Sequence, residues 1–264
     1  MLSYLYYMLT LLRKIRRSLI KTGKARNYLL YAIGEIILVV IGILIALEVN
    51  NWNEAKKLLN KEITVYKEIH SELAETLKDV KDDKQDWEEI LNASVRVRDM
   101  LVQNNIQEDS LMRYIYRTFD LEQSNPKTSA FESLKSLGLD VLSNDTLRQD
   151  ITTLYQLTIP SLITSDAAVE AGKIRDKIQP LWEKYLKVDR SAIQGLLASN
   201  EPSFRRGRFL NLVNTEYLIK DEPLVLTLQN SLNWRLKVIG IHERVINHIK
   251  TIMATIEVEI ERLS

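Results

Sequence analysis

The residue with the clearest chemical potential is a glutamate inside an apolar stretch. Glu35 is the only charged residue between Tyr28 and Leu47, whose other members are apolar, aromatic or small. A carboxylate inside hydrocarbon costs at least a few kcal/mol, so such groups normally face a protein partner or water. Glu35 could therefore hydrogen-bond across a helix–helix interface, or it could bind and release protons in an ion-coupled complex.

Small residues share a helical face with this glutamate. At about 100° per residue, Ala32, Glu35, Gly42 and Ala46 fall on one stripe. Small residues allow a second helix to approach closely. The stripe predicts a docking face within the membrane, for another copy of this chain or for another membrane protein.

The histidines limit metal and acid–base chemistry. His242 and Glu243 resemble the start of a zinc-protease motif, but Ile246 stands where the second histidine ligand is required, so we expect no metal site. His70 and His242 lie on heptad positions, and an antiparallel register with paired numbers summing to about 312 would bring them together. Such a pair could respond to pH or bind a metal. Two unrelated, hydrogen-bonded histidines are the alternative.

Composition narrows the classes of function. With no Cys, the chain has no disulfide, no Cys-based zinc site and no thiol nucleophile. Seven of the 36 basic residues and no acidic ones lie in residues 1–27, so the remainder is acidic and is not expected to bind nucleic acid. Phosphate-loop, nucleophile-elbow and EF-hand motifs are missing from the sequence. We expect a protein that is not an enzyme and has no cofactor.

Residues 28–49 predict a transmembrane helix. At about 1.5 Å per residue, the apolar run extends about 30 Å, which matches the hydrocarbon core of a bilayer. Tyr28, Tyr31 and Trp52 stand near its ends, where interfacial aromatic residues are found. The run is too long for a cleaved signal peptide and lacks a small-residue cleavage site.

The basic arm in residues 1–27 sets the expected orientation. By the positive-inside rule, this arm lies in the cytoplasm and residues 50–264 lie outside it, in the periplasm of a bacterium. Leucine and isoleucine recur in the arm at the spacing of an amphipathic helix that lies on anionic lipid. The alternative is a basic tail that only sets the topology. The basic residues expected to set topology and contact lipid are Arg13, Lys14, Arg16 and Arg17.

Two long helices are expected to frame the body. Apolar side chains recur at alternating steps of four and three residues from 59 to 101 and again from 228 to 263. These heptad patterns predict helices that pack antiparallel. Shorter helices lie between them, one opened by a Ser129/Glu132 capping box, and no strand is expected. The predicted fold is all-α: one N-terminal transmembrane helix, then an elongated antiparallel helical bundle with long first and last helices.

Two stretches resemble a known family. Residues 28–54, YLLYAIGEIILVVIGILIALEVNNWNE, are similar to the N-terminal signature of an uncharacterised family of single-span proteins common in Bacteroidota. Residues 129–155, SAFESLKSLGLDVLSNDTLRQDITTLY, resemble its internal segment. The resemblance implies a protein of the bacterial inner membrane with a helical periplasmic domain, and it makes Glu35 part of the signature. It implies no activity, cofactor or catalytic residue.

These observations favour a non-enzymatic, membrane-anchored periplasmic bundle that senses a condition, scaffolds or binds a partner. The alternative is an accessory subunit of an ion-coupled membrane complex that uses Glu35.

Overall fold

The computed structural model describes residues 13–14, 17, 25–118, 124–191 and 210–264. Contacts divide the chain into two units, Met1–Lys61 and Glu62–Ser264. One helix, α2 (Ala25–Val102), passes through both units. The all-α prediction is confirmed, whereas the domain boundaries at residues 27 and 49 stay predictions.

The two longest helices are α2, with 78 residues, and α11 (Glu222–Leu263), with 42. The prediction of a long first and a long last helix is therefore confirmed. The other helical elements are α3 (Glu108–Thr118), α4 (Ser129–Leu137), the 3-10 helix η1 (Leu139–Val141), α5 (Asp145–Thr153), the π-helix η2 (Leu154–Thr158), α6 (Ser161–Thr164), α7 (Asp166–Gly172), α8 (Ile174–Trp182) and α10 (Thr215–Leu218).

A small β-sheet occurs where the sequence predicts no strand. β1 (Leu186–Val188) pairs antiparallel with β2 (Leu210–Leu212), and Lys187 lies opposite Asn211. The prediction that the body has no strand is therefore wrong. Each strand has three residues, which is too short for the alternating pattern that reveals a strand in a sequence.

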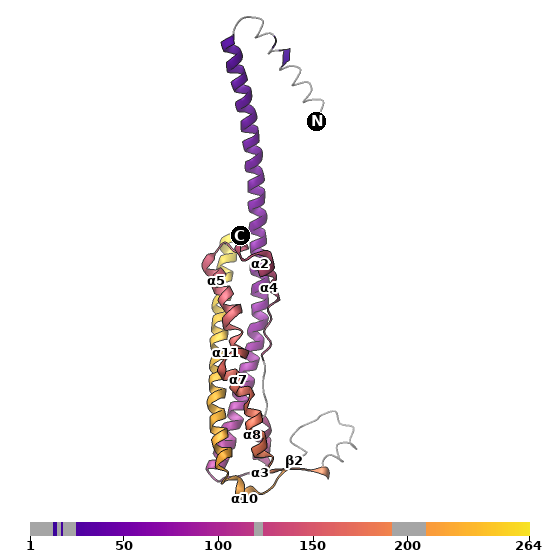
Figure 1. Ribbon diagram of the computed structural model, residues 1–264, viewed down its shortest axis with the longest axis vertical. Coiled ribbons are helices and arrows are strands. Elements are labelled where there is room, and N and C mark those ends of the chain that lie inside the picture. Colours follow the sequence, from indigo (N-terminus) through magenta and orange to yellow (C-terminus); the bar gives the residue numbers. More distant parts are fainter. Residues whose placement is uncertain (1–12, 15–16, 18–24, 119–123, 192–209) are drawn as a thin grey trace. The chain divides into compact units, whose positions relative to one another are not determined.

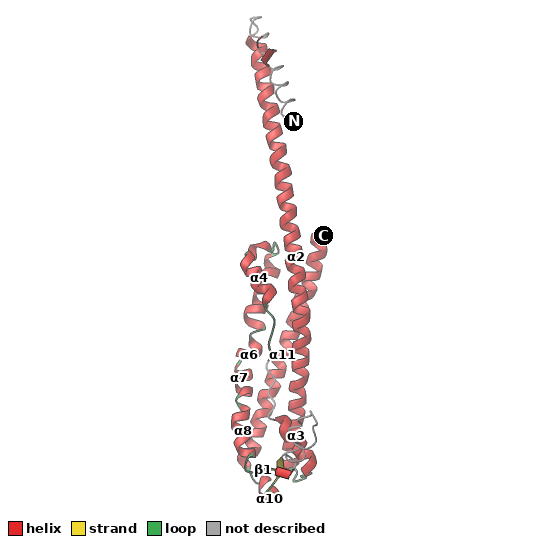
Figure 2. Ribbon diagram, turned by 90° about the vertical axis from the view of Figure 1, so that its right-hand side faces the viewer, coloured by secondary structure: helices red, strands yellow, loops and turns green. Residues whose placement is uncertain are grey.

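Within the unit Glu62–Ser264, the second half of α2 lies antiparallel beside α11, as Figures 1 and 2 both show. The hydrogen bonds that reveal the register join His70 to Glu257 (2.9 Å), Arg98 to Gln229 (3.4 Å) and Arg235 to Ser94. The paired numbers sum to between 327 and 329. The helices thus pack in the expected antiparallel direction. Their register differs from the expected one, in which paired residue numbers sum to about 312.

The heptad pattern of α2 is correct for one set of core positions and displaced by one residue for the other. The correct set recurs every seven residues and is buried: Tyr66, Leu73, Val80, Trp87, Ser94 and Leu101. In the second set, the buried positions are 62, 69, 76, 90 and 97, whereas residues 63, 70, 77, 91 and 98 are only partly buried. The buried positions include the polar residues Glu62 and Thr76. A pattern built on apolar residues cannot identify them as core positions.

A column of short helices covers one side of α11. The elements α5, η2, α6, α7 and α8 contact α11 in turn, and Figure 2 shows α6, α7 and α8 following one another along the bundle. Ile178 and Trp182 of α8 are fully buried, as are Leu228 and Ile249 of α11. The core of this unit therefore lies between α11, the second half of α2 and this column.

We predict that Ile249→Ala lowers the free energy of unfolding by about 2–5 kcal/mol, because it opens a cavity in this core. Val258→Ala is the matched control on the same helix. Val258 is 66% exposed, so its truncation should change stability by no more than about 0.5 kcal/mol. Urea unfolding of the full chain in detergent measures both values. Equal effects of the two substitutions would contradict the core placement.

Candidate functional site

The first half of α2 exposes a continuous apolar surface. Within residues 29–49, Ile36 is 63% exposed, Leu38 70% and Val49 60%. Among the described residues, α2 is the one helix long and apolar enough to cross a membrane, and its most apolar part has no buried residue. By composition and length this surface is fit for contact with lipid or with another apolar helix.

The predicted docking face lies on this surface. Glu35, Gly42 and Ala46 are exposed, and Ala32 is partly exposed. A Cβ atom added at Gly42 would meet no other atom within 4 Å. The structure thus leaves the stripe open, without showing what covers it.

The predicted interfacial and lipid-facing residues are described in part. Trp52 is 66% exposed, and Lys56 Nζ lies 5.6 Å from the centre of its ring. Tyr31 is partly exposed. Arg13, Lys14 and Arg17 are exposed, while Arg16 and the side chain of Tyr28 lie outside the described residues.

The structure does not bring His70 and His242 together. His70 lies near one end of the helix pair, where its Nε2 is 2.9 Å from Glu257 Oε1. His242 precedes Glu257 by about four helical turns on α11. The predicted pair is therefore wrong, because the true register places each histidine in a different layer. In the described part of the chain, no three His, Asp or Glu side chains gather as metal ligands would.

His242 instead forms a buried pair with a serine that the sequence did not single out. It is 1% exposed, and its Nδ1 donates to the Val238 carbonyl at 2.9 Å. Its Nε2 lies 3.2 Å from the hydroxyl of Ser124, which is itself 5% exposed. A carbonyl only accepts, so the neutral ring carries its hydrogen on Nδ1 and accepts from Ser124 at Nε2. Burial holds the pKa of His242 below its usual value.

A serine hydroxyl beside an imidazole is also the arrangement of a nucleophile and its general base. Here a backbone carbonyl orients the imidazole, and both side chains are closed off from solvent. Two surface grooves, of about 470 and 450 Å³, are lined by other residues. A substrate could reach Ser124 only after the structure opens, so the pair as it stands is a structural contact.

A buried arginine anchors the centre of the bundle. Arg235 is 1% exposed and donates to Ser94 Oγ, to Ser231 Oγ at 3.1 Å and to the Thr118 carbonyl at 2.5 Å. Burial lowers its pKa to about 10, which leaves the guanidinium charged at neutral pH. Sequence reasoning did not assign Arg235 a role, although a charged residue on an otherwise apolar heptad position is a signal that could have found it.

A carboxylate of α2 holds the start of α4. Glu72, which is 8% exposed, accepts hydrogen bonds from Ser129 Oγ at 2.6 Å and from the backbone N–H of Ala130 at 2.7 Å. Its other oxygen accepts from the Tyr155 hydroxyl at 2.8 Å. The predicted capping box is therefore wrong: Ser129 caps nothing within its own helix, because its hydroxyl is bound to Glu72.

Two further carboxylates hold the turn between η1 and α5. Glu62 of α2 accepts from the backbone N–H and the hydroxyl of Ser143, at 2.7 and 2.8 Å. Glu259 of α11 accepts from Asn144 Nδ2 at 3.2 Å and from Arg262. The hydrogen bond from Arg262 is the main cause that lowers the pKa of Glu259, and the Asn144 amide adds to it. Asn144 also caps α5 through Leu147.

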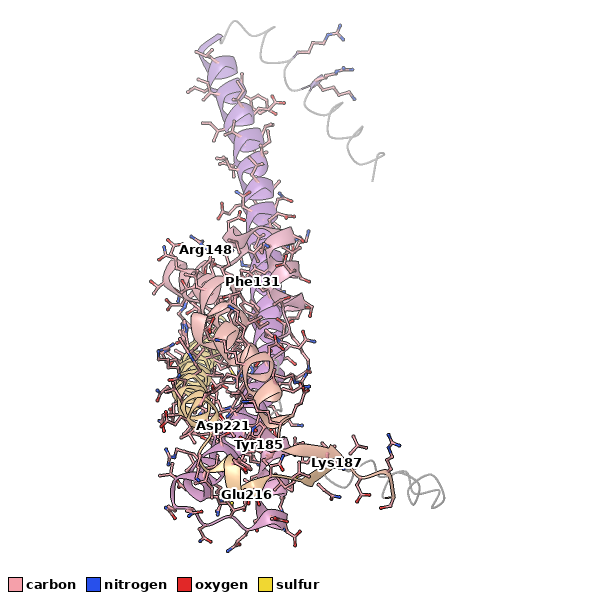
Figure 3. The ribbon with its side chains drawn as sticks, turned by 60° about the horizontal axis from the view of Figure 1, so that its bottom comes forward. Phe131, Arg148, Tyr185, Lys187, Glu216 and Asp221 are labelled. Carbon is pink, nitrogen blue, oxygen red and sulfur yellow. The ribbon has the colours of Figure 1, made fainter. Side chains whose placement is uncertain are left out.

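These contacts give a physical meaning to the second family-like stretch. Phe131 of α4, labelled in Figure 3, stacks on Tyr155 with ring centres 4.6 Å apart. Asn144 caps a helix, and Arg148 donates to the Leu142 carbonyl at 3.1 Å. The stretch is thus a folded clasp, which we define as residues 129–155, fixed by Glu62, Glu72 and Glu259. Sequence reasoning missed these glutamates, because a single acidic residue on a long charged helix gives no signal.

An aspartate fixes the start of α11. Asp221 accepts from the backbone N–H of Leu224 at 3.0 Å, from the Tyr185 hydroxyl at 2.8 Å and from Lys184 at 3.2 Å; Tyr185 and Asp221 are neighbours in Figure 3. Burial opposes the charge of Asp221, but these three hydrogen bonds outweigh it and lower its pKa. Burial and the bond to Asp221 raise the pKa of Tyr185 to about 12.

Comparison with known proteins identifies one family. The model of a family of unknown function, DUF6090, matches residues 35–178, which is more than half of the chain. No curated protein and no solved structure matches the chain.

We predict that Glu72→Gln lowers the free energy of unfolding by about 1–3 kcal/mol, because an amide nitrogen replaces one oxygen that accepts buried hydrogen bonds. Glu75→Gln is the control one turn away. Glu75 pairs with Lys127 at the surface, where ion pairs are worth at most about 1 kcal/mol. Chemical unfolding measures both effects, and hydrogen exchange should show faster exchange in α4 for Glu72→Gln alone. A cost for Glu75→Gln equal to that for Glu72→Gln would show that the clasp is not held in this way.

Proposed function

We propose that this chain, which belongs to the DUF6090 family of unknown function, is a single-span membrane protein whose helical bundle binds a partner or senses a condition outside the cytoplasm. The observation that carries the proposal is the exposed apolar surface on the first half of α2.

The size of this surface argues for a bilayer. Removing a large apolar side chain from water is worth about 1.5–3 kcal/mol, and nearly every residue from Leu29 to Leu47 is of this kind or small. A soluble helix of similar length would bury one stripe and leave a polar face. Apart from Glu35, the surface in residues 29–47 is apolar around its whole circumference, as contact with lipid requires.

The proposed orientation has residues 1–27 in the cytoplasm and residues 50–264 in the periplasm, with the span in the bacterial inner membrane. The basic arm supports this direction, and its described members Arg13, Lys14 and Arg17 are free to meet lipid headgroups.

The partner is proposed to contact the docking face formed by Ala32, Glu35, Gly42 and Ala46. It is either a second copy of this chain or another membrane protein. A lone carboxylate in hydrocarbon needs a hydrogen-bonding group at its own depth. Such a group, together with small residues that admit close approach, is what the partner has to supply.

A non-enzymatic role fits the arrangement of the polar groups. Ser124 and His242 are enclosed, Arg235 is bound to three oxygen atoms, and the glutamates of the clasp bind neighbouring backbone and side chains. Each group thus has a structural use. This supports binding or sensing over catalysis.

We predict that the full chain stays in the membrane pellet after alkaline carbonate extraction. Val39→Arg combined with Val40→Arg should move the protein to the soluble fraction, since each central arginine costs at least about 2.5 kcal/mol to insert. Val102→Arg, at a site that is 65% exposed in the bundle unit, is the matched control and should remain in the pellet. Release of the unaltered chain by carbonate would refute membrane insertion.

Orientation is tested with single cysteines, which the cysteine-free chain permits without background. In intact spheroplasts, an impermeant maleimide should label Ser264→Cys and leave Ser18→Cys unlabelled. The reverse labelling pattern would show that the topology is opposite to the proposed one, although the membrane anchor would still stand.

The second candidate function is an accessory subunit of an ion-coupled membrane complex. Glu35 favours it, because this carboxylate is exposed within an apolar surface that no described residue buries. A structural hydrogen bond and a proton carrier make different demands on this side chain. An amide keeps hydrogen-bonding capacity but cannot release a proton.

We predict that a defined partner copurifies in mild detergent and is lost with Gly42→Leu, which fills the docking face. Glu35→Gln should retain the partner under the binding hypothesis. In vesicles that contain the copurified complex, a pH-sensitive dye should report equal proton flux for the unaltered chain and for Glu35→Gln. Abolished flux with the partner retained would favour the ion-coupled subunit. A chain that purifies without any partner and without self-association would contradict both.

A further inference from the structure

The segment that leads into α4 is attached to both long helices. We define residues 124–128 as the α4 lead. Ser124 binds His242 of α11 in the core, and Lys127 pairs with Glu75 of α2 at the surface. Directly after the lead, Ser129 and Ala130 are held by Glu72. The contact with His242 is the one member of this set that is both buried and built on a group that titrates near neutral pH.

Both ring nitrogens of His242 are committed in the neutral form. Nδ1 donates to the Val238 carbonyl, and Nε2 accepts from the Ser124 hydroxyl. Protonation would place a hydrogen on Nε2, directed at Ser124, so that the serine hydroxyl loses its acceptor and its oxygen has to accept from the ring instead. It would also place a positive charge where the side chain is 1% exposed.

Charged groups around the imidazole come from α2 and from α11 itself. Asp83 of α2 favours a positive charge on the ring, and Lys84 beside it opposes that charge. Lys84 is paired with Glu88 at 3.2 Å. On α11, Arg235 carries its buried positive charge seven residues earlier on the same heptad stripe. Burial, together with Lys84, outweighs the hydrogen bond to the Val238 carbonyl and the charge of Asp83, which both favour the charged ring, and so holds the pKa of His242 below its usual value.

We propose that His242 is an acid-sensitive latch that holds the α4 lead at neutral pH and releases it as the pH falls. The imidazole of the opened state reaches water and regains its ordinary pKa of about 6.5. The opened state therefore binds a proton before the closed state does, and a fall in pH favours opening. Above about pH 7.5 neither state is protonated and the latch contributes no pH dependence.

The size of the response has an upper limit. Below the ordinary pKa, the opening equilibrium rises up to about tenfold for each pH unit, until the closed state is protonated too. Between pH 7.5 and pH 5.0 the largest possible increase is about 30-fold. This response does not depend on membrane anchoring, so it can succeed or fail separately from the proposed function.

The test is hydrogen exchange with mass spectrometry on the full chain in lipid nanodiscs at pH 7.5 and 5.0. Rates are corrected for the intrinsic pH dependence of amide exchange. Peptides that cover the α4 lead and the start of α4 should open more at pH 5.0. His242→Gln should remove this increase. His248→Gln is the control, because His248 bonds to Thr158 of η2 and not to the lead, and should keep it.

A second measurement decides the matter if His242→Gln fails to fold. The chain has three histidines, so carbon-13 labelling of their Cε1 atoms gives three signals, assigned from His70→Gln and His248→Gln. The His242 signal should titrate below the ordinary pKa of about 6.5. A His242 signal that titrates at or above this value overturns the latch. Two exchange results would overturn it as well. One is a corrected exchange rate that is equal at both pH values, and the other is a response that persists in a folded His242→Gln chain.

Discussion

The burial of one guanidinium group fixes the arrangement of the bundle. Arg235 remains charged inside the core, and a buried charge is tolerable only where its N–H groups find acceptors. Ser94 of α2, Ser231 of its own helix and the Thr118 carbonyl supply acceptors for the two terminal nitrogens, while Nε has no hydrogen-bond partner among the described residues. If α11 slid along α2 by one heptad, apolar side chains could pair again, but the guanidinium would lose Ser94. The apolar heptad positions of α2 and α11 would allow several registers. The hydrogen bonds of Arg235 select one of them.

This register determines which polar groups meet elsewhere. It brings Glu259 beside the turn that contains Asn144, and it places His242 beside the segment that precedes α4. The family match ends at residue 178, so α11 lies beyond it. The clasp at residues 129–155 lies within the match, yet part of what holds it comes from α11. Its acidic anchors on α2, Glu62 and Glu72, lie within the match as well.

One continuous helix serves two different surroundings. Apart from Glu35, residues 29–47 of α2 are apolar or small on all sides and largely exposed, whereas the second half of α2 buries a row of apolar residues and turns charged residues outward. The first pattern suits lipid and the second suits the core of a water-soluble bundle. Most buried polar groups of that bundle, such as those of Glu72, Ser124 and His242, bond to groups on neighbouring elements.

The sequence by itself determined the features that depend on local composition and period. The apolar run around Glu35, the two long helices and the direction of their packing all follow from residue type and spacing, and the structure agrees on the helices and on the direction. A partner that contacts the span and a role for Glu35 stay predictions. The strands β1 and β2 were missed, because three residues carry no readable period.

Only the tertiary structure decided the register and the buried polar contacts. The sequence left open whether His70 and His242 meet, whereas folding pairs His70 with Glu257 and His242 with Ser124, which lies more than a hundred residues earlier in the chain. It also redirected Ser129 from its own helix to Glu72. The physical reason is the same in each case. Apolar contacts are non-directional and repeat with every heptad, so they leave the register open, whereas a buried donor or acceptor requires one particular partner.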